Sequence, residues 1–346
     1  MALIHGGQLQ QVAEQYKIPV ADWLDLSTGI APISYPIPDI ALSAWQQLPQ
    51  HSPELIIAAK QYYQCSQLVV TNGSQAIIKA LPELNSQRNI ASQDVYLPER
   101  GYKEHAQAWE LAGYTLHFYR NSLPELNELS MNCIVVIINP NNPTGQFFDR
   151  AVISQYHKKV KQLNGLLVVD EAFIDVMPND QSYCNEVGFE EDHVIVLRSF
   201  GKFFGLAGIR IGFLIASEYW CQKFKELLGP WQVNGPAQII AEKALSDTVW
   251  HQDQCVKLHA LRVQQEALLW QTFSDKLVST IEGCDLFLTL SFHQTDNAKK
   301  LYHLLCKQGV YCRLSDEQDT LRFGIALDYN FKRFNSACRQ ACNTLE

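Results

Sequence analysis

The sequence predicts an α/β protein in which a large domain with a mainly parallel sheet is joined to a smaller α+β domain. Between residues 65 and 216, short runs rich in valine and isoleucine alternate with helix-like segments, a pattern typical of parallel strands buried on both faces. After the turn at Gly229 and Pro230 this alternation ends. A chain of 346 residues is long enough for two domains, which we expect at 31–240 and at 1–30 with 241–346.

The predicted elements of the large domain follow one another as strand, helix, strand. Its strands are Leu68–Thr71, Asp94–Leu97, Cys133–Ile138, Leu166–Val169, Val194–Leu197 and Ile209–Ile215. Its helices are Gly73–Leu81, Tyr102–Ala112 and Asp149–Leu163. The smaller domain is expected to hold a long helix, a strand, a helix and two strands: Pro236–Phe273, Leu286–Phe292, Asp296–Lys307, Val310–Leu314 and Thr320–Ala326. Residues 1–30 fit neither pattern, and we expect them to pack beside the C-terminal domain and reach the active site.

Composition narrows the classes of partner. With 28 Lys and Arg against 36 Asp and Glu, the net charge of -8 argues against nucleic acid or an anionic membrane as the main partner. The ten cysteines include no Cys-x-x-Cys pair, so we expect reduced thiols and no metal site. The N-terminus lacks the pattern of a signal peptide, and the longest aliphatic run, Ile134–Ile138, is too short to span a bilayer. These observations predict a soluble, cytoplasmic protein.

The segment Arg198–Lys202 holds the strongest local signal for chemistry. It closes the predicted strand Val194–Leu197 and carries Lys202 on a glycine-containing turn. An amine that forms a Schiff base must be held in one place and partly desolvated, which this position allows. Ser199 would donate to a phosphate, and Arg210 at the start of the next predicted strand would pair with the same phosphate. Taken alone, Ser-x-x-Lys favours a surface lysine beside a turn.

Polar residues follow two other buried strands at their carboxyl ends, where open parallel sheets bind ligands. The loop Asn139–Gly145 contains two X-Pro steps that stiffen it, so that an asparagine side chain can be aimed. Asp170 follows four apolar residues, and a carboxylate there needs a cationic partner such as a pyridinium nitrogen. A structural turn and a helix N-cap aspartate remain the simpler alternatives.

Two further positions suit a flat, phosphorylated cofactor. Thr71–Gln75 join a strand to a helix, whose first backbone N–H groups bind phosphate well. The ring of Tyr102 would lie against a flat ring system. An ordinary strand-to-helix turn and a core tyrosine are the alternatives.

Arginines in the last predicted strands suggest an anionic substrate. Arg322 lies inside an apolar strand and Arg313 in the strand before it, and a buried cation needs an anionic partner. Structural ion pairs would also explain them. His5 lies in a flexible His-Gly-Gly element at the N-terminus.

The motifs occur in the order TNGSQ, GY, NPNNPTG, DEAF, SFGK, AGIRIG and LRFG. In order and spacing, and over nearly the whole chain, they resemble the fold-type I pyridoxal-phosphate (PLP) enzymes of the class I/II aminotransferase family. The resemblance implies that Lys202 holds PLP as a Schiff base, that Asp170 pairs with the pyridine nitrogen and that Asn142 bonds the ring hydroxyl. It also implies a homodimer.

The same resemblance implies the remaining site residues. Tyr102 would stack on the cofactor ring, and Arg322 would receive a substrate anion. The cofactor phosphate would be held by Gly73, Ser74, Gln75, Ser199 and Arg210.

Within the family, several segments are similar to the threonine-phosphate decarboxylases of cobalamin synthesis. These segments are His5–Gly7, Asp22–Pro32, Gly101–His105, Phe200–Gly208 and Pro230–Pro236. Such carboxy-lyases convert L-threonine O-3-phosphate to (R)-1-amino-2-propanol O-2-phosphate. The similarity implies a phosphorylated amino-acid substrate and a substrate side formed by His5, Thr28, Gly29, Asn142, Arg313 and Arg322.

A histidinol-phosphate-type aminotransferase is the main alternative. Aminotransferases of the family usually have tyrosine three residues after the pyridine-binding aspartate, and this chain has Phe173 there. The phenylalanine matches the decarboxylase branch. A third reading, a PLP-fold protein that has lost catalysis, is disfavoured because the four motif residues are all present: Lys202, Asp170, Asn142 and Arg210.

Overall fold

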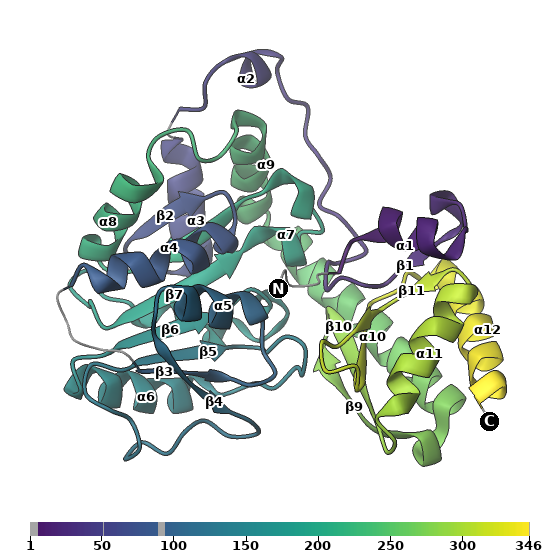
Figure 1. Ribbon diagram of the computed structural model, residues 1–346. Helices are drawn as coiled ribbons and strands as arrows, with labels where there is room; N and C mark the ends of the chain where they lie inside the picture. The colour runs from purple at the N-terminus through teal and green to yellow at the C-terminus, as the bar shows by residue number, and fades with distance from the viewer. Residues whose placement is uncertain (1–5, 51, 89–93, 346) are drawn as a thin grey trace. The chain divides into compact units, whose positions relative to one another are not determined.

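The computed structural model describes residues 6–50, 52–88 and 94–345. They form two compact units (Figure 1). The large unit comprises the described residues of Tyr35–Asn142 and Gln146–Val249. The small unit comprises those of Met1–Ser34, Pro143–Gly145 and Trp250–Glu346. We retain the boundaries 31–240 and 1–30 with 241–346 as a proposal about independently folding domains.

The large unit is built on a seven-stranded sheet in the order β2-β8-β7-β6-β5-β3-β4. β8 runs antiparallel to both neighbours, and the other pairs are parallel, so the predicted mainly parallel sheet is confirmed. The strands span Leu68–Thr71 (β2), Asp94–Pro98 (β3), Thr115–Tyr119 (β4), Ile134–Ile138 (β5), Leu166–Asp170 (β6), Val194–Ser199 (β7) and Gly212–Ile215 (β8).

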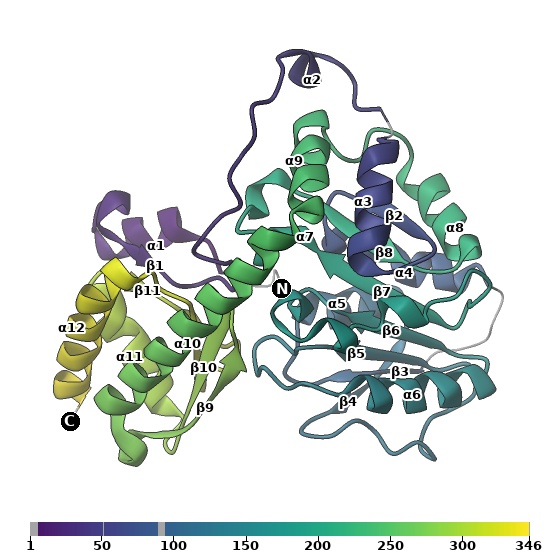
Figure 2. The same cartoon turned by 180° about the vertical axis from the view of Figure 1, so that it is seen from behind.

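Helices α4 (Ser74–Ser86), α5 (Lys103–Leu111) and α8 (Glu218–Leu228) lie on one face of this sheet (Figure 1). Val168 and Leu197 share one apolar cluster with Trp109 of α5 and Trp220 of α8. Helix α3 (Pro53–Tyr63) lies on the opposite face (Figure 2). There Tyr63 packs against Phe213 with ring centroids 5.0 Å apart. Because side chains alternate along a strand, these clusters tell which face each strand residue points to.

The small unit contains an antiparallel sheet in the order β12-β13-β10-β9. Its strands are β9 (Val278–Cys284), β10 (Phe287–Phe292), β12 (Arg313–Leu314) and β13 (Thr320–Gly324). Its helices are α1 (Leu9–Tyr16), most of α10 (Thr248–Leu277), α11 (Asp296–Lys307) and α12 (Asp328–Leu345). From the N-terminal segment, β1 (Leu24–Asp25) pairs in parallel with β11 (Val310–Tyr311). The first thirty residues, as far as they are described, therefore pack with the C-terminal part of the chain.

Several predicted elements are wrong in their extent, among them the helix Gly73–Leu81, which continues to Ser86, and the following three. The predicted helix Pro236–Phe273 is two helices, α9 (Gly235–Ser246) and α10 (Thr248–Leu277), because Asp247 between them is not helical. The predicted strand Val310–Leu314 divides at Cys312 into β11 and β12, which join different sheets. The predicted strand Ile209–Ile215 starts only at Gly212, after a 3-10 turn at Ala207–Ile209.

Among the described residues, no helix combines the length and the apolar character that a membrane span requires. The ten cysteines all lie within the described residues and form no disulfide there, and Cys65 and Cys255 are partly exposed whereas the others are buried.

One glycine holds the short segment Pro143–Gly145 to the small unit. Gly145 has φ 74°, and a Cβ atom there would lie 2.3 Å from the Cα of Gly283 in β9. Thr289 of β10 donates its hydroxyl to the Pro143 carbonyl at 2.5 Å. The backbones at Gly145 and Gly283 lie so close together that there is no room for a side chain at position 145.

We expect Gly145→Ala to lower the free energy of unfolding by about 3 kcal/mol, from a left-handed backbone and a clash together. Gly113→Ala is the matched control, because Gly113 also has positive φ (85°) but open space around its Cβ position. Gly113→Ala should lower the free energy of unfolding by only about 1 kcal/mol. Urea unfolding curves measure both variants, and equal losses would contradict the contact with Gly283.

Candidate active site

Asp170 ends β6 with its side chain on the face covered by α5. It is 3% exposed, and its carboxylate accepts two hydrogen bonds, from His105 Nε2 to Oδ2 at 2.9 Å and from the Ala172 amide to Oδ1 at 3.1 Å. His105 is 2% exposed and comes from α5. A carboxylate has about four lone-pair positions, so this one is oriented while retaining acceptor capacity for a cation.

Sequence reasoning missed His105. The sequence feature that could have revealed it is its position in the first turn of the predicted helix, three residues after Tyr102 and on the same face as the buried Trp109. A histidine on a buried helix face needs a polar partner, and Asp170 is that partner here.

The first turn of α4 meets the ends of β7 and β8. Gly73 precedes the helix with φ 97°, and a Cβ atom there would lie 2.6 Å from Arg210 Nη2. Ser199 is paired with Gly212 across β7 and β8. A Cβ atom on Gly212 would lie 2.7 Å from the Ser74 amide nitrogen. The structure therefore gathers Gly73, Ser74, Ser199 and Arg210 at one helix N-terminus, a place suited to an anion.

The prediction that Arg210 begins a strand is wrong. Arg210 has φ 56° and follows the 3-10 turn Ala207–Ile209, two residues before β8. Its Nη1 donates to the Ala207 carbonyl at 3.1 Å. The left-handed backbone turns the side chain towards Gly73, a direction that an apolar strand pattern does not reveal.

Tyr102 and Gln75 form a hydrogen-bonded chain between the starts of α5 and α4. The Tyr102 hydroxyl donates to Gln75 Oε1 at 2.9 Å, and Gln75 Nε2 donates to Glu104 Oε2 at 2.6 Å. Burial, and next the negative charges of Glu104 and Asp170, raise the pKa of Tyr102 to about 12. The tyrosine is thus a neutral phenol with a fixed ring.

Lys202 lies on the one-turn helix α7 (Phe200–Phe203), directly after β7. Its Nζ lies 5.7 Å from the centroid of the Phe173 ring, and Phe173 is 3% exposed. The turn is tight because a Cβ atom on Gly201 would lie 2.6 Å from the Cα of Ala207. An aromatic ring without a hydroxyl therefore lies beside the lysine amine.

Asn142 belongs to a loop that hydrogen bonds connect to the end of β6 and to the segment before α5. The Asn139 amide donates to the Asp170 carbonyl at 2.8 Å, and Asn141 Nδ2 donates to the Arg100 carbonyl at 2.6 Å. Asn142 is half-buried and is the last residue of the large unit before Pro143.

In the small unit, Arg313 of β12 and Arg322 of β13 are direct cross-strand partners. Arg322 is 9% exposed and donates from Nη2 to the Ser27 carbonyl at 2.8 Å, and Arg313 donates from Nη2 to Asp316 at 2.8 Å. Burial, and next the charge of Arg313, lower the pKa of Arg322 to about 10. Like charges directly opposite each other destabilise a sheet, so this pair suits an added anion.

The backbone of Ser27 and Thr28 packs beside Arg322. The Gly7 amide donates to the Ser27 hydroxyl at 2.8 Å, and a Cβ atom on Gly324 would lie 2.2 Å from the Thr28 carbonyl oxygen. Gly29 follows and is buried. The structure thus brings Thr28, Gly29 and Arg322 together, whereas the predicted His5 lies outside the described residues.

The donors of the large unit fit PLP. A buried carboxylate suits its pyridine nitrogen, a helix N-terminus with an arginine suits its phosphate, and a lysine suits its aldehyde. Only glycine fits at Gly73, which leaves the backbone open to a close ligand. Among the described residues, no group of three His, Cys, Asp or Glu could hold a metal ion.

Comparison with known proteins gives relatives that match nearly the whole chain. The model of the family "Aminotransferase class I and II" matches residues 45–327. The chain is 37% identical to the threonine-phosphate decarboxylase of Pseudomonas aeruginosa, over 94% of each chain. It is 34% identical to the threonine-phosphate decarboxylase of a Sinorhizobium species, again over 94% of each.

Among solved structures, the histidinol-phosphate aminotransferase of Sinorhizobium meliloti in complex with pyridoxal-5'-phosphate is similar with a TM-score of 0.81. The similarity covers 100% of this chain and 96% of that one at 17% identity, so it concerns the fold. The fold-type I class expected from the ordered motifs is confirmed. Family match and sequence identity agree, and the chain belongs to the class I and II aminotransferase family.

Proposed function

We propose that this protein is a PLP-dependent carboxy-lyase that converts L-threonine O-3-phosphate to (R)-1-amino-2-propanol O-2-phosphate in cobalamin biosynthesis. The similarity to two threonine-phosphate decarboxylases along 94% of the chain carries the proposal. We further propose a cytoplasmic homodimer, because ten cysteines without a disulfide suit a reducing compartment and the family resemblance implies a dimer.

Bound PLP would supply an aldehyde that captures amines and a ring that accepts electrons. Lys202 would hold the aldehyde carbon, and Asp170 would keep a proton on the ring nitrogen. His105 orients that carboxylate through its bond to Oδ2. Tyr102 would lie on the ring and Asn142 would bond its hydroxyl. The phosphate would rest on the amides of Gly73, Ser74 and Gln75, with Ser199 and Arg210.

The arginines of the small unit would decide which bond at Cα breaks. A tight ion pair with the substrate carboxylate would stabilise the reactant more than the transition state, in which that charge leaves as carbon dioxide. We therefore assign the stronger cationic grip to the substrate phosphate, with Arg322 and Arg313 as its partners and His5 assisting. A phosphate held at a distance fixes the rotation about Cα. Thr28 and Gly29 would line the same side, and the Lys202 amine or a water would return a proton to Cα.

The residue beside the lysine supports decarboxylation over transamination. Phe173 presents an apolar ring 5.7 Å from Lys202 Nζ, where aminotransferases of the family usually have tyrosine. A histidinol-phosphate-type aminotransferase is the second candidate, supported by the shared fold and by sequence similarity over a smaller part of the chain.

Incubation of the PLP-loaded protein with L-threonine O-phosphate should release carbon dioxide and aminopropanol phosphate, detected by mass spectrometry. Histidinol phosphate with 2-oxoglutarate is the matched control and should give no keto product. Formation of glutamate in that control, without release of carbon dioxide from threonine phosphate, would favour the aminotransferase.

Borohydride reduction of the PLP-loaded protein should attach the cofactor to the peptide that contains Lys202. Lys202→Ala should abolish the label and lower kcat by at least ~1000-fold, because no other amine would hold the cofactor. Lys223→Ala, a change of a partly exposed lysine of α8, should keep both label and activity. A label on any other lysine in the wild-type protein would refute the assignment.

Arg322→Gln and Arg313→Gln should each lower kcat/KM for L-threonine O-phosphate by ~30-fold or more, through loss of an ionic contact. Against unphosphorylated L-threonine, the difference from wild type should shrink, because the phosphate that the arginines bind is missing. Arg339→Gln on α12 is the surface control. Near wild-type kcat/KM for both variants would disprove the phosphate grip.

A further inference from the structure

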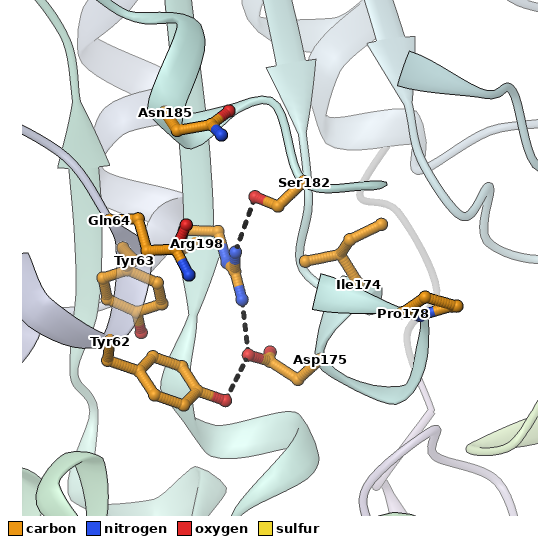
Figure 3. A pocket seen from close by; sticks show the side chains of 9 residues that line it. All are labelled: Tyr62, Tyr63, Gln64, Ile174, Asp175, Pro178, Ser182, Asn185 and Arg198. Atoms are coloured by element: carbon orange, nitrogen blue, oxygen red, sulfur yellow. Dashed lines mark hydrogen bonds and ion pairs between the residues drawn. The ribbon is translucent and has the colours of Figure 1, made fainter. Parts of the chain in front are cut away.

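A buried cluster of charges lies at the ends of β6 and β7, the strand ends that also carry the proposed cofactor site. Figure 3 shows four of its members, Arg198, Asp175, Ser182 and Tyr62. Arg198 is 4% exposed, forms an ion pair with Asp175 through Nη2, and approaches Glu171 with Nη1 at 3.4 Å. Ser182 and Tyr62 complete the cluster, with hydroxyl bonds to Glu171 at 2.6 Å and to Asp175 at 2.8 Å. We call these five residues the Arg198 cluster.

The Arg198 cluster lies on the opposite face of the sheet from Asp170. Asp170 is in register with Leu197, and Leu197 points into the apolar cluster under α4 and α5. Successive strand residues point to opposite faces, so Glu171 and Arg198 point towards α3. There the Arg198 guanidinium lies 4.5 Å from the centroid of the Tyr63 ring. Arg198 therefore contacts none of the groups assigned to the cofactor.

The cluster nevertheless joins the segments that carry those groups. Glu171 directly follows Asp170, and Arg198 directly precedes Ser199. Asp175 lies in the 3-10 turn Ile174–Val176, one residue beyond the turn's start and two beyond Phe173.

A second connection leads to the turn that carries Lys202. The ring of Tyr62, which bonds Asp175, lies 6.0 Å from the ring of Phe204. Phe204 directly follows α7 and stacks on Phe200 at 4.2 Å. Movement of the Arg198 cluster would thus be passed to both ends of the α7 turn.

The energetics favour a geometric role over a stabilising one. Burial raises the pKa of Glu171, and the charge of Arg198 opposes this rise. Buried ion pairs can often be replaced by apolar groups without loss of stability, so their presence needs another reason. The fork of an arginine fixes the positions of two carboxylates at once, which a single point charge does not.

We propose that Arg198 is a positioning residue: by binding Glu171 and Asp175 together it sets the position of the Asp170 carboxylate relative to the Lys202 amine. The inference rests on the proposed PLP function. Arg198 would thus belong to the site although it lies on the α3 face of the sheet, opposite to the face that carries Asp170.

The test uses the PLP-loaded protein and the variant Arg198→Met/Glu171→Gln/Asp175→Asn, which removes all three charges together and leaves no lone buried ion. We expect a thermal midpoint near that of the wild type, kcat lowered ~10- to 100-fold by misplacement of reacting groups, and KM changed by less than ~3-fold. The pH midpoint at which the visible band of bound PLP changes should also shift. The single variant Arg198→Lys, which keeps a positive charge, should show a smaller loss of kcat and a smaller shift of the pH midpoint than the triple variant.

The pair Arg262 and Glu266 on α10 supplies the matched control, because its partners lie 2.8 Å apart and belong to the small unit. Arg262→Met/Glu266→Gln should leave kcat and the pH midpoint unchanged. If the triple variant does not fold, Tyr62→Phe removes only the bond to Asp175 and keeps the ring beside Phe204. It should lower kcat ~3-fold and shift the midpoint in the same direction.

Wild-type kcat and an unshifted midpoint in a folded triple variant, or in Tyr62→Phe, would overturn the positioning role. A wild-type protein that binds no PLP at Lys202 would instead refute the proposed function, and borohydride labelling separates these outcomes.

Discussion

A carboxylate at the end of a buried strand costs free energy unless donors surround it, and Asp170 shows how the large unit meets this requirement. His105 and the Ala172 amide hold its side chain. The backbone beside it is equally fixed, because its carbonyl accepts from the Asn139 amide and the next amide donates to the Leu197 carbonyl. The three motif-bearing strand ends β5, β6 and β7 are thereby tied to this one residue. The loop of Asn142 and the turn of Lys202 take their positions from it.

The two units would bind anions by different physical means. In the large unit, a helix N-terminus, two close-fitting glycines and Arg210 form a cradle of backbone donors whose partial charges cost little to assemble. In the small unit, two full charges oppose each other across β12 and β13, and burial together with the charge of Arg313 lowers the pKa of Arg322. A cradle of the first kind suits a cofactor that stays. Paired arginines suit a ligand that arrives with its own charge and leaves again, since their repulsion returns when it departs.

Much of the fold was predictable because strands buried on both faces leave an unmistakable apolar pattern. The polar residue after each strand was predictable too, which is why Asp170 and Lys202 stand where expected, while their roles came from the order of motifs. What escaped prediction depends on contacts between distant segments. His105 acquires its meaning from Asp170 and Arg210 from Gly73, and the break at Asp247 changes the helical pattern by a single residue. None of these leaves a periodic trace in the sequence.

The segment Pro143–Gly145 belongs to the small unit although it interrupts the large one, so the chain passes between the units four times rather than twice. This arrangement limits the production of the large unit as a separate recombinant protein. A shortened chain ending near residue 249 would keep the large unit's own strands yet lose β9 and β10, the surface on which Pro143 and Gly145 rest. The neighbouring Asn142 would then be followed by a residue that has lost its hydrogen bond to Thr289. If one unit is exchanged between homologous enzymes, the segment Pro143–Gly145 must therefore be exchanged together with the C-terminal part.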